Sequence, residues 1–215
     1  MLIHVVDFEG SSRCGVIEFG IVTLDGDQII DTRTSLCRAN APILPKESLL
    51  HGIRNESLEN RESFDTCEGL FFAMRKNGVF AAHHAPVEDG FLSRYWTVAP
   101  STHVELPSNL GRPGSWGPWI DTCKLAKEVW KGLESYSLMA LVKYFDFEPR
   151  LKEFSSKYCP EDRRFAHCAL YDALASAMLI NLIRSETEWE DRQLIEASSS
   201  GNRSSSAQSQ EEWDL

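Results

Sequence analysis

Two acidic residues lie two positions apart near the start of the chain, in the apolar stretch Val5-Val6-Asp7-Phe8-Glu9. If this stretch is a β-strand, its alternating geometry points both carboxylates to the same face. Two like charges on a half-buried face repel each other, and divalent cations with oxygen ligands are the usual compensation. The pair therefore predicts a metal site. The alternative is an exposed edge strand whose two acids lie in water.

A histidine and an acid, His167 and Asp172, lie at the start of a segment with helical apolar spacing, residues 166–184. On a helix, five residues at about 100° each place the two side chains about 140° apart in projection. We therefore expect them to flank one site without ligating the same ion, the acid on a metal and the imidazole positioned to deprotonate a water. The alternative is that His167 caps the helix or lies on the surface.

A third group of polar residues follows the short apolar run of residues 79–82, which is typical of a buried parallel strand. His83 and His84 come directly after it, at the end of the strand where α/β sheets bind ligands. Glu88 and Asp89 lie at the start of the next helical pattern. Because a helix N-terminus favours acids, the helix dipole alone could also explain this pair.

The elements that must position these residues are a sheet and its helices. Segments Leu2–Phe8, Val16–Leu24 and Gln28–Leu36 predict an antiparallel meander, with a turn at residues 25–27. Residues 97–118 are rich in Pro, Gly and Ser and predict a long loop. Helices are predicted over residues 63–76, 87–95, 122–130, 137–145 and 166–184.

The composition suits one globular domain, since 42% of the 215 residues are hydrophobic and 25% are charged. We expect this domain to span residues 1–190. Residues 197–215 form a Ser-rich, acidic tail with too few apolar side chains to offset the entropy of ordering, so disorder is expected. The end of the tail combines acids with an aromatic residue and could bind a protein partner, the alternative being a solvated tail without a role.

The net charge of −10 argues against binding nucleic acid through a broadly basic surface. It is compatible with a nuclease, because carboxylates that hold divalent metals let those metals attract phosphate. The six cysteines include no CxxC pair, and the chain shows no signal peptide or membrane span. We therefore expect reduced, mostly buried thiols in a cytoplasmic protein that does not insert into a membrane.

Together these segments resemble the DEDDh branch of the DEDD 3′-5′ exonucleases, the family that contains the proofreading subunit of the bacterial replicative polymerase. Its first motif, Asp-x-Glu on a strand, is matched by Asp7 and Glu9, and its third, His-x-Ala-x-x-Asp-Ala, by residues 167–173. Residues 120–126 and 136–141 are similar to the region between its second and third motifs.

The second motif of the family is similar to residues 83–92, with two departures. Glu88 stands where the family has Asp, and Asp89 follows it, although the register of Phe91-Leu92 favours Glu88 as the functional acid. His84 replaces the usual Asn.

The resemblance implies a ribonuclease H-like α/β fold, with a mixed central sheet flanked by helices. It implies that two Mg²⁺ or Mn²⁺ ions are held by Asp7, Glu9, Glu88 and Asp172. It also implies that these acids and His167, as the base, release nucleoside 5′-monophosphates from the 3′ end of single-stranded DNA or RNA. The residues expected to contact the substrate are Phe8, Gly10, Ser11, His83 and His84.

Other readings stay open. The chain could keep the fold and act as a catalytically weak binding or scaffold protein beside a polymerase or repair partner. A hydrolase with a serine or cysteine nucleophile is disfavoured, because no Gly-x-Ser-x-Gly segment is present. Phe8, Trp96, Trp116 and Trp119 could stack on bases or pack in the core. The choice between DNA and RNA and the presence of a homodimer are not decided by the sequence.

Overall fold

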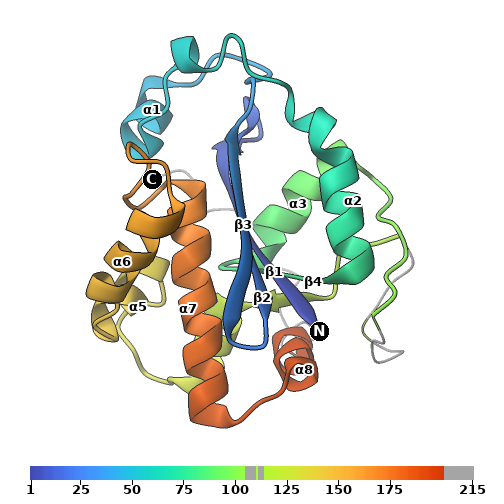
Figure 1. Cartoon of the computed structure of the whole chain (residues 1–215), viewed down its shortest axis with the longest axis vertical. Coiled ribbons are helices and arrows are strands. Elements are labelled where there is room, and N and C mark those ends of the chain that lie inside the picture. Colours follow the sequence, from blue (N-terminus) through green and yellow to red (C-terminus); the bar gives the residue numbers. More distant parts are fainter. Residues whose placement is uncertain (105–109, 111–113, 201–215) are drawn as a thin grey trace.

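A five-stranded mixed sheet with strand order β3-β2-β1-β4-β5 forms the centre of the molecule (Figure 1). The computed structural model describes residues 1–104, 110 and 114–200. Strands β1 to β3 are antiparallel neighbours, whereas β4 runs parallel to both β1 and β5. The strands are β1 (Leu2–Ser11), β2 (Gly15–Asp25), β3 (Gln28–Leu36), β4 (Gly78–Ala82) and β5 (Trp119–Asp121). The mixed sheet and the meander predicted from the sequence are confirmed.

Helices cover both faces of this sheet (Figure 1). The long helix α7 packs against β1 and β2 on one face, while α2 and α3 lie on the other. The α-helices are α1 (Pro45–His51), α2 (Glu68–Asn77), α3 (Ala85–Tyr95), α4 (Thr122–Val129), α5 (Leu138–Tyr144), α6 (Glu148–Tyr158), α7 (Ala169–Thr187) and α8 (Asp191–Ser200). Two short 3-10 segments are η1 (Asn55–Ser57) and η2 (Phe64–Cys67). In the described part of the chain, no helix combines the length and the apolar character needed to cross a membrane.

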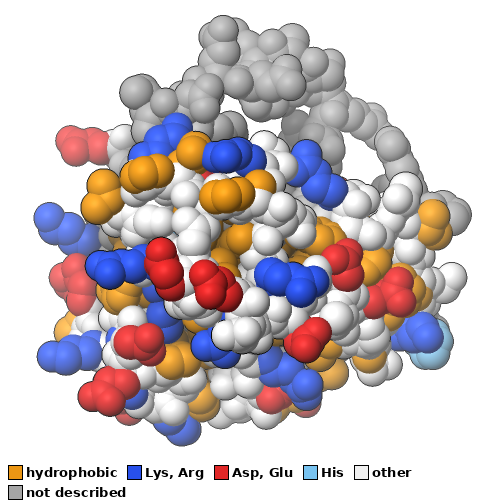
Figure 2. Space-filling view, turned by 90° about the horizontal axis from the view of Figure 1, so that it is seen from above, with side chains coloured by type: hydrophobic (Ala, Val, Ile, Leu, Met, Phe, Trp, Pro, Cys, Tyr) orange, Lys and Arg blue, Asp and Glu red, His pale blue; other side chains and the backbone are white. Residues whose placement is uncertain are grey.

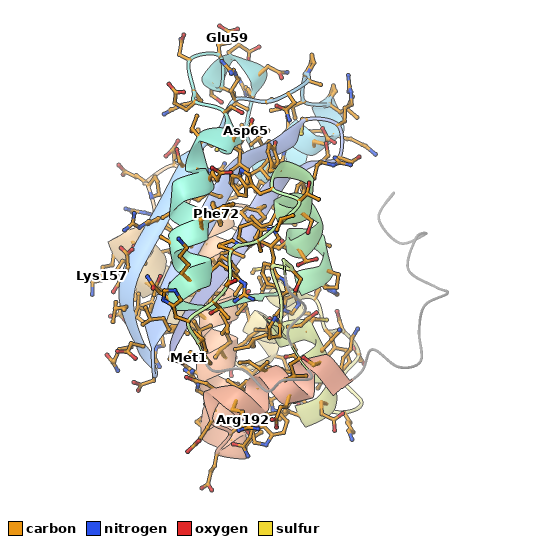
Figure 3. All side chains as sticks on the ribbon, turned by 90° about the vertical axis from the view of Figure 1, so that its right-hand side faces the viewer. Met1, Glu59, Asp65, Phe72, Lys157 and Arg192 are labelled. Atoms are coloured by element: carbon orange, nitrogen blue, oxygen red, sulfur yellow. The ribbon has the colours of Figure 1, made fainter. Side chains whose placement is uncertain are left out.

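The alternation of β1 divides its side chains between two cores. Ile3 and Val5 face α7, in a core built largely from apolar residues of that helix. Phe8 faces the other way, and its ring packs against Phe64 and Phe71 at centroid distances of 5.4 and 5.7 Å. Figure 3 looks onto α2 and α3, whose side chains fill the space in front of the sheet. Each fully buried large side chain contributes roughly 1.5–3 kcal/mol to this packing.

Local signals in the sequence fix where several helices begin. The side chain of Asp121 caps α4, because its Oδ1 accepts hydrogen bonds from the backbone N–H groups of Cys123 and Lys124. Pro86 lies in the first turn of α3, where its missing N–H would have no helical partner. Because α4 follows β5 and α3 follows β4, both helices begin at the same edge of the sheet.

The structure differs from the sequence prediction at several helices. Helices α1 and α6 lie in segments for which no helix was predicted, and α7 begins at Ala169, three residues later than expected. Residues 197–200, predicted as the start of the tail, are the last turn of α8, so that part of the prediction is wrong. Leu194 and Ile195 are buried in the core, which explains why this segment is ordered. The rest of the predicted tail, residues 201–215, and loop residues 105–109 and 111–113 lie outside the described residues.

Candidate active site

The acids singled out in the sequence come together in one cavity of about 830 Å³. Asp7 and Glu9 reach it from the end of β1, on the face covered by α7. Glu88 enters from the first turn of α3, and Asp172 from the first turn of α7. Three segments that are distant in the sequence therefore meet at the carboxyl ends of the parallel strands.

His167 shares this cavity and lies close to two of the acids. The ligand atoms of Glu9, His167 and Asp172 all lie within 4.8 Å of one another. His167 precedes α7 and has a φ of +64°, so the helical projection used to separate it from Asp172 does not apply. The helical projection that placed the two side chains about 140° apart is therefore wrong, and their ligand atoms lie close enough together to reach one ion. The His167 ring is exposed to solvent.

Three carboxylate oxygens in the cavity are buried without a hydrogen-bond partner among the described residues. They are Oδ2 of Asp7, Oε2 of Glu88 and Oδ1 of Asp172. A buried carboxylate oxygen without a donor is costly, and a hard cation bound by oxygen ligands would remove that cost. The donor set therefore fits divalent ions such as Mg²⁺ or Mn²⁺.

The electrostatics of the cluster agree with this reading. Burial and, after it, the charges of the nearby Asp172 and Glu18 together raise the pKa of Glu9 to about 8. Burial also raises the pKa of Asp172, to about 7, against the opposing hydrogen bond from the His167 backbone. The pKa values of Asp7 and Glu88 lie well above the ordinary range, mainly through burial and then through neighbouring carboxylates. A cluster of this kind holds protons until a cation offsets its charge.

The two adjacent acids of α3 have different environments. Glu88 is buried and lines the cavity with the other carboxylates. Asp89 points to a separate depression, where its Oδ1 accepts a hydrogen bond of 2.7 Å from Nε1 of Trp119. The geometry therefore places Glu88, and not Asp89, among the candidate ligands.

Comparison with known proteins agrees with this arrangement. A sequence model of the RNase_T exonuclease family matches residues 13–180. The chain belongs to this exonuclease family. The resemblance to exonucleases predicted from the motifs is thereby confirmed.

The relatives of this chain include a DNA polymerase and an exodeoxyribonuclease. It is 33% identical to the PolC-type DNA polymerase III of Thermotoga maritima over 135 residues, which are 62% of this chain and 9% of that protein. The chain thus spans less than a tenth of the polymerase. It is 23% identical to exodeoxyribonuclease 10 of Escherichia coli over 196 residues, covering 91% of this chain and 74% of the relative.

Solved structures of exonucleases share the fold. Exonuclease X in complex with 5′ overhanging duplex DNA superposes with a TM-score of 0.66 at 22% identity, covering 91% of this chain and 99% of the other. The nuclease domain of 3′hExo, a DEDDh family member bound to rAMP, gives 0.57 at 17% identity, covering 87% and 92%. This likeness shows the ribonuclease H-like fold expected from the sequence.

Within this exonuclease fold, the two histidines after β4 have a different character from His167. The ring of His83 is hydrogen-bonded within the protein. Its Nδ1 lies 2.8 Å from Oγ1 of Thr122, the first residue of α4, and its Nε2 lies 2.9 Å from the carbonyl oxygen of Tyr136. Burial lowers its pKa to about 4, so the ring is neutral. Both ring nitrogens are thus engaged within the protein, while His83 also lines the cavity, and its contact with the substrate stays a prediction. His84 lines the cavity and has a left-handed backbone, with φ of +69°.

The aromatic residues considered for base stacking are mostly in the core. Phe8 touches the cavity, but its ring is buried among Phe64, Phe71 and Phe91. Trp96 and Trp116 are also buried. Packing, one of the two alternatives named for these residues, describes all three rings, and the predicted contact of Phe8 with the substrate stays a prediction. Trp119 stacks on Phe80 with ring centroids 5.3 Å apart. Gly10 and Ser11, also predicted to contact the substrate, do line the cavity.

Among the residues that the structure describes, sequence reasoning missed six charged side chains around the site. Glu18 is a buried acid of β2 whose charge acts on three of the carboxylates, and it forms a buried ion pair with Arg163. A lone acid in the otherwise apolar segment Gly15–Leu24 was the available signal. The other missed charged residues line the cavity and follow no pattern that would have indicated them; they are the cations Arg13, Lys46 and Arg94 and the acid Glu47.

Proposed function

We propose that this chain is a metal-dependent 3′-5′ exonuclease that hydrolyses the terminal phosphodiester bond of a nucleic acid strand and releases a nucleoside 5′-monophosphate. The observation that carries the proposal is the convergence of four carboxylates, three of them buried and that of Asp7 half-buried, beside one exposed imidazole in a single cavity. The family membership of the chain supports the same reaction class.

The four acids Asp7, Glu9, Glu88 and Asp172 would hold two Mg²⁺ or Mn²⁺ ions. When bound, such ions lower the pKa of a water and neutralise charge that develops on the phosphate. The acids themselves come from three rigid elements, which limits their movement during the reaction.

His167 would accept the proton of the attacking water. Its ring is exposed at the cavity, so a water between it and the carboxylates can reach it. Partial burial lowers the pKa of the imidazole, which keeps a proton-accepting nitrogen available near neutral pH. The backbone bond from His167 to Asp172 holds this base beside one of the proposed metal ligands.

The substrate we propose is the 3′ end of single-stranded DNA or RNA. Figure 2 views the end of the molecule that carries α1 and the start of α7, where acidic and basic side chains are mixed with hydrophobic ones. That surface offers no broad basic area, so affinity would come from the site itself, through the ions and the cavity cations Arg13, Lys46 and Arg94. Cytoplasmic location, a homodimer and a partner for the tail stay predictions from the sequence.

The direct test uses 5′-labelled single-stranded DNA and RNA with Mg²⁺, Mn²⁺ or EDTA, and separates products at single-nucleotide resolution. We expect a ladder that shortens from the 3′ end with either metal and no cleavage in EDTA. Asp7→Asn, purified in the same way, should leave the strand intact while retaining its fold. Equal cleavage by wild type and Asp7→Asn would contradict the proposal, as would a folded wild-type protein that leaves both strands intact.

A further inference from the structure

We propose that the buried ion pair of Arg163 and Glu18 is a positioning device that sets the location of the base His167 and the metal ligand Asp172. The inference rests on the proposed function, because it gives these two residues their roles. Neither Arg163 nor Glu18 lines the cavity in which the chemistry would occur. They act through the backbone segments that carry the reacting side chains.

The pair is built as a two-pronged contact. Nε and Nη2 of Arg163 donate to Oε1 and Oε2 of Glu18 at 2.9 and 2.5 Å. Both side chains are buried, with relative exposures of 9% for Arg163 and 3% for Glu18. Such a fork between a guanidinium and a carboxylate fixes orientation as well as distance.

Arg163 uses its remaining donors to tie two further segments to this contact. Its Nη1 donates to the carbonyl oxygen of His51, the last residue of α1, at 2.5 Å. Its Nη2 also lies 3.5 Å from the carbonyl oxygen of His167. One guanidinium thus connects strand β2, the end of α1 and the backbone of the proposed base.

Glu18 holds the other side of the same segment. Its Oε2 accepts a hydrogen bond of 3.0 Å from the backbone N–H of Ala169, the first residue of α7. Gly20, two residues further along β2, lies directly under this point: a Cβ on Gly20 would come within 2.2 Å of the backbone of Ala169 and Leu170. The start of α7, and with it Asp172 one turn later, is therefore held against β2.

This arrangement explains how His167 keeps an unfavourable backbone. Its φ of +64° lies in the left-handed region, which residues other than glycine adopt only where neighbouring contacts hold them. The contacts flank it on both sides, with its carbonyl near Arg163 and its N–H bonded to Oδ2 of Asp172 at 3.0 Å. Loss of the fork would free the segment, and the imidazole and the carboxylate would lose their common position.

The pair also keeps Glu18 from acting as a fifth metal ligand. Its two oxygens are occupied by Arg163 and Ala169, and the guanidinium compensates its charge. Without Arg163, a buried acid would remain beside the four carboxylates and would compete with them for cations. Arg163 therefore keeps Glu18 out of the set of metal ligands, in addition to positioning His167 and Asp172.

The test uses Arg163→Lys, which keeps the positive charge and removes the fork, and the double variant Glu18→Gln/Arg163→Met, which removes both charges of the buried pair together. The matched control is Arg164→Lys, because the neighbouring Arg164 donates only to the carbonyl oxygens of Cys159 and Ser156 among the bonds described. For the folded variants of Arg163 we expect kcat to fall roughly 10–100-fold, as for other residues that orient metal ligands. KM should change less than about threefold, because the substrate contacts stay.

Two further readouts separate positioning from stability alone. Assays run well below the melting temperature of each variant remove the contribution of unfolding. Mn²⁺ affinity, measured by calorimetry without substrate, should fall about tenfold in Arg163→Lys and stay at the wild-type value in Arg164→Lys. The calorimetric result stands even if wild type proves inactive as a nuclease, which would refute only the proposed function. Wild-type kcat and Mn²⁺ affinity in folded Arg163→Lys would overturn the positioning role, whatever the behaviour of the double variant.

Discussion

The backbone N–H of His167 donates a hydrogen bond of 3.0 Å to Oδ2 of Asp172, while Oδ1 of the same carboxylate is buried and has no hydrogen-bond partner in the described part of the chain. One acid thus has two separate tasks. One oxygen positions the proposed base, and the other remains free to bind a cation. The spatial relation between base and ligand is therefore set by the protein before any metal binds.

Replacing His167 tests whether its imidazole acts as the base beside Asp172. We expect His167→Asn to lower kcat roughly 10²–10⁴-fold, the usual contribution of a positioned general base. Asparagine tolerates the left-handed backbone of this position, and the ring is exposed, so unfolding free energy should change by less than about 1 kcal/mol. Single-turnover assays and urea melts measure the two quantities. Activity near wild type would show that another group accepts the proton.

The two acids of α3 offer a paired comparison. Glu88→Gln should abolish most of the activity, because Glu88 is buried in the cavity with one oxygen unpaired. Asp89→Asn should keep activity within about threefold of wild type, since an amide oxygen can still accept the hydrogen bond from Trp119. The rates at which the two variants shorten a labelled strand, measured in parallel, show which of the two acids the activity requires. The reverse order of effects would assign the second motif to Asp89.

The raised pKa values predict opposite responses to pH with and without metal. For Glu9 and Asp172, pKa values of about 8 and about 7 exceed the ordinary values of 4.5 and 3.8. Their contribution to stability is thus fully present below the ordinary values and is lost as pH rises through 7 and 8. The melting temperature of the metal-free protein should therefore fall as pH rises toward 7 and 8. Added Mg²⁺ should raise the melting temperature by a larger amount at each higher pH, because more of the acids are ionised. A Mg²⁺-induced shift that shrinks between pH 6 and pH 9 would contradict the assignment.

The contact between β2 and α7 leaves no room for a side chain at Gly20. We expect Gly20→Ala to destabilise the fold by about 3 kcal/mol, because its Cβ would collide with the backbone of Ala169 and Leu170 at 2.2 Å. The matched control is Gly69→Ala in α2, where the Cβ meets nothing within 4 Å and the higher helix propensity of alanine adds up to about 1 kcal/mol. Urea unfolding distinguishes them, and equal stability of the two variants would argue against the close approach.

Much of the site could be predicted from the sequence because its geometry follows from simple periodicity. The two-residue spacing of Asp7 and Glu9 was enough to put both on one face of β1, since strand alternation depends little on context. The environment of His167 could not be obtained in this way. Its helical spacing continues the pattern of α7, but Cys168 is the N-cap and the helix begins only at Ala169. Helix starts depend on tertiary contacts, here the bond from Glu18 to Ala169, which a periodic pattern does not contain.

Tertiary contacts also explain why the start of the tail was predicted too early in the sequence. Helix α8 contributes the buried residues Leu194 and Ile195 and the partly buried Ala197 to the core, followed by a run of serines typical of disorder. The order of that segment comes partly from Ser198, whose Oγ accepts a hydrogen bond from the backbone N–H of Asp121 at 3.0 Å. Such a contact between distant segments leaves no trace in local composition.

The central claim, that four carboxylates from three segments hold a pair of cations, is tested most directly by anomalous diffraction from crystals soaked in Mn²⁺. We expect two anomalous peaks within the cavity, ligated by Asp7, Glu9, Glu88 and Asp172. Crystals of Asp7→Asn, treated identically, should lose at least one of them. Mn²⁺ peaks only at other places on the molecule, with the four carboxylates left without an ion, would contradict the account.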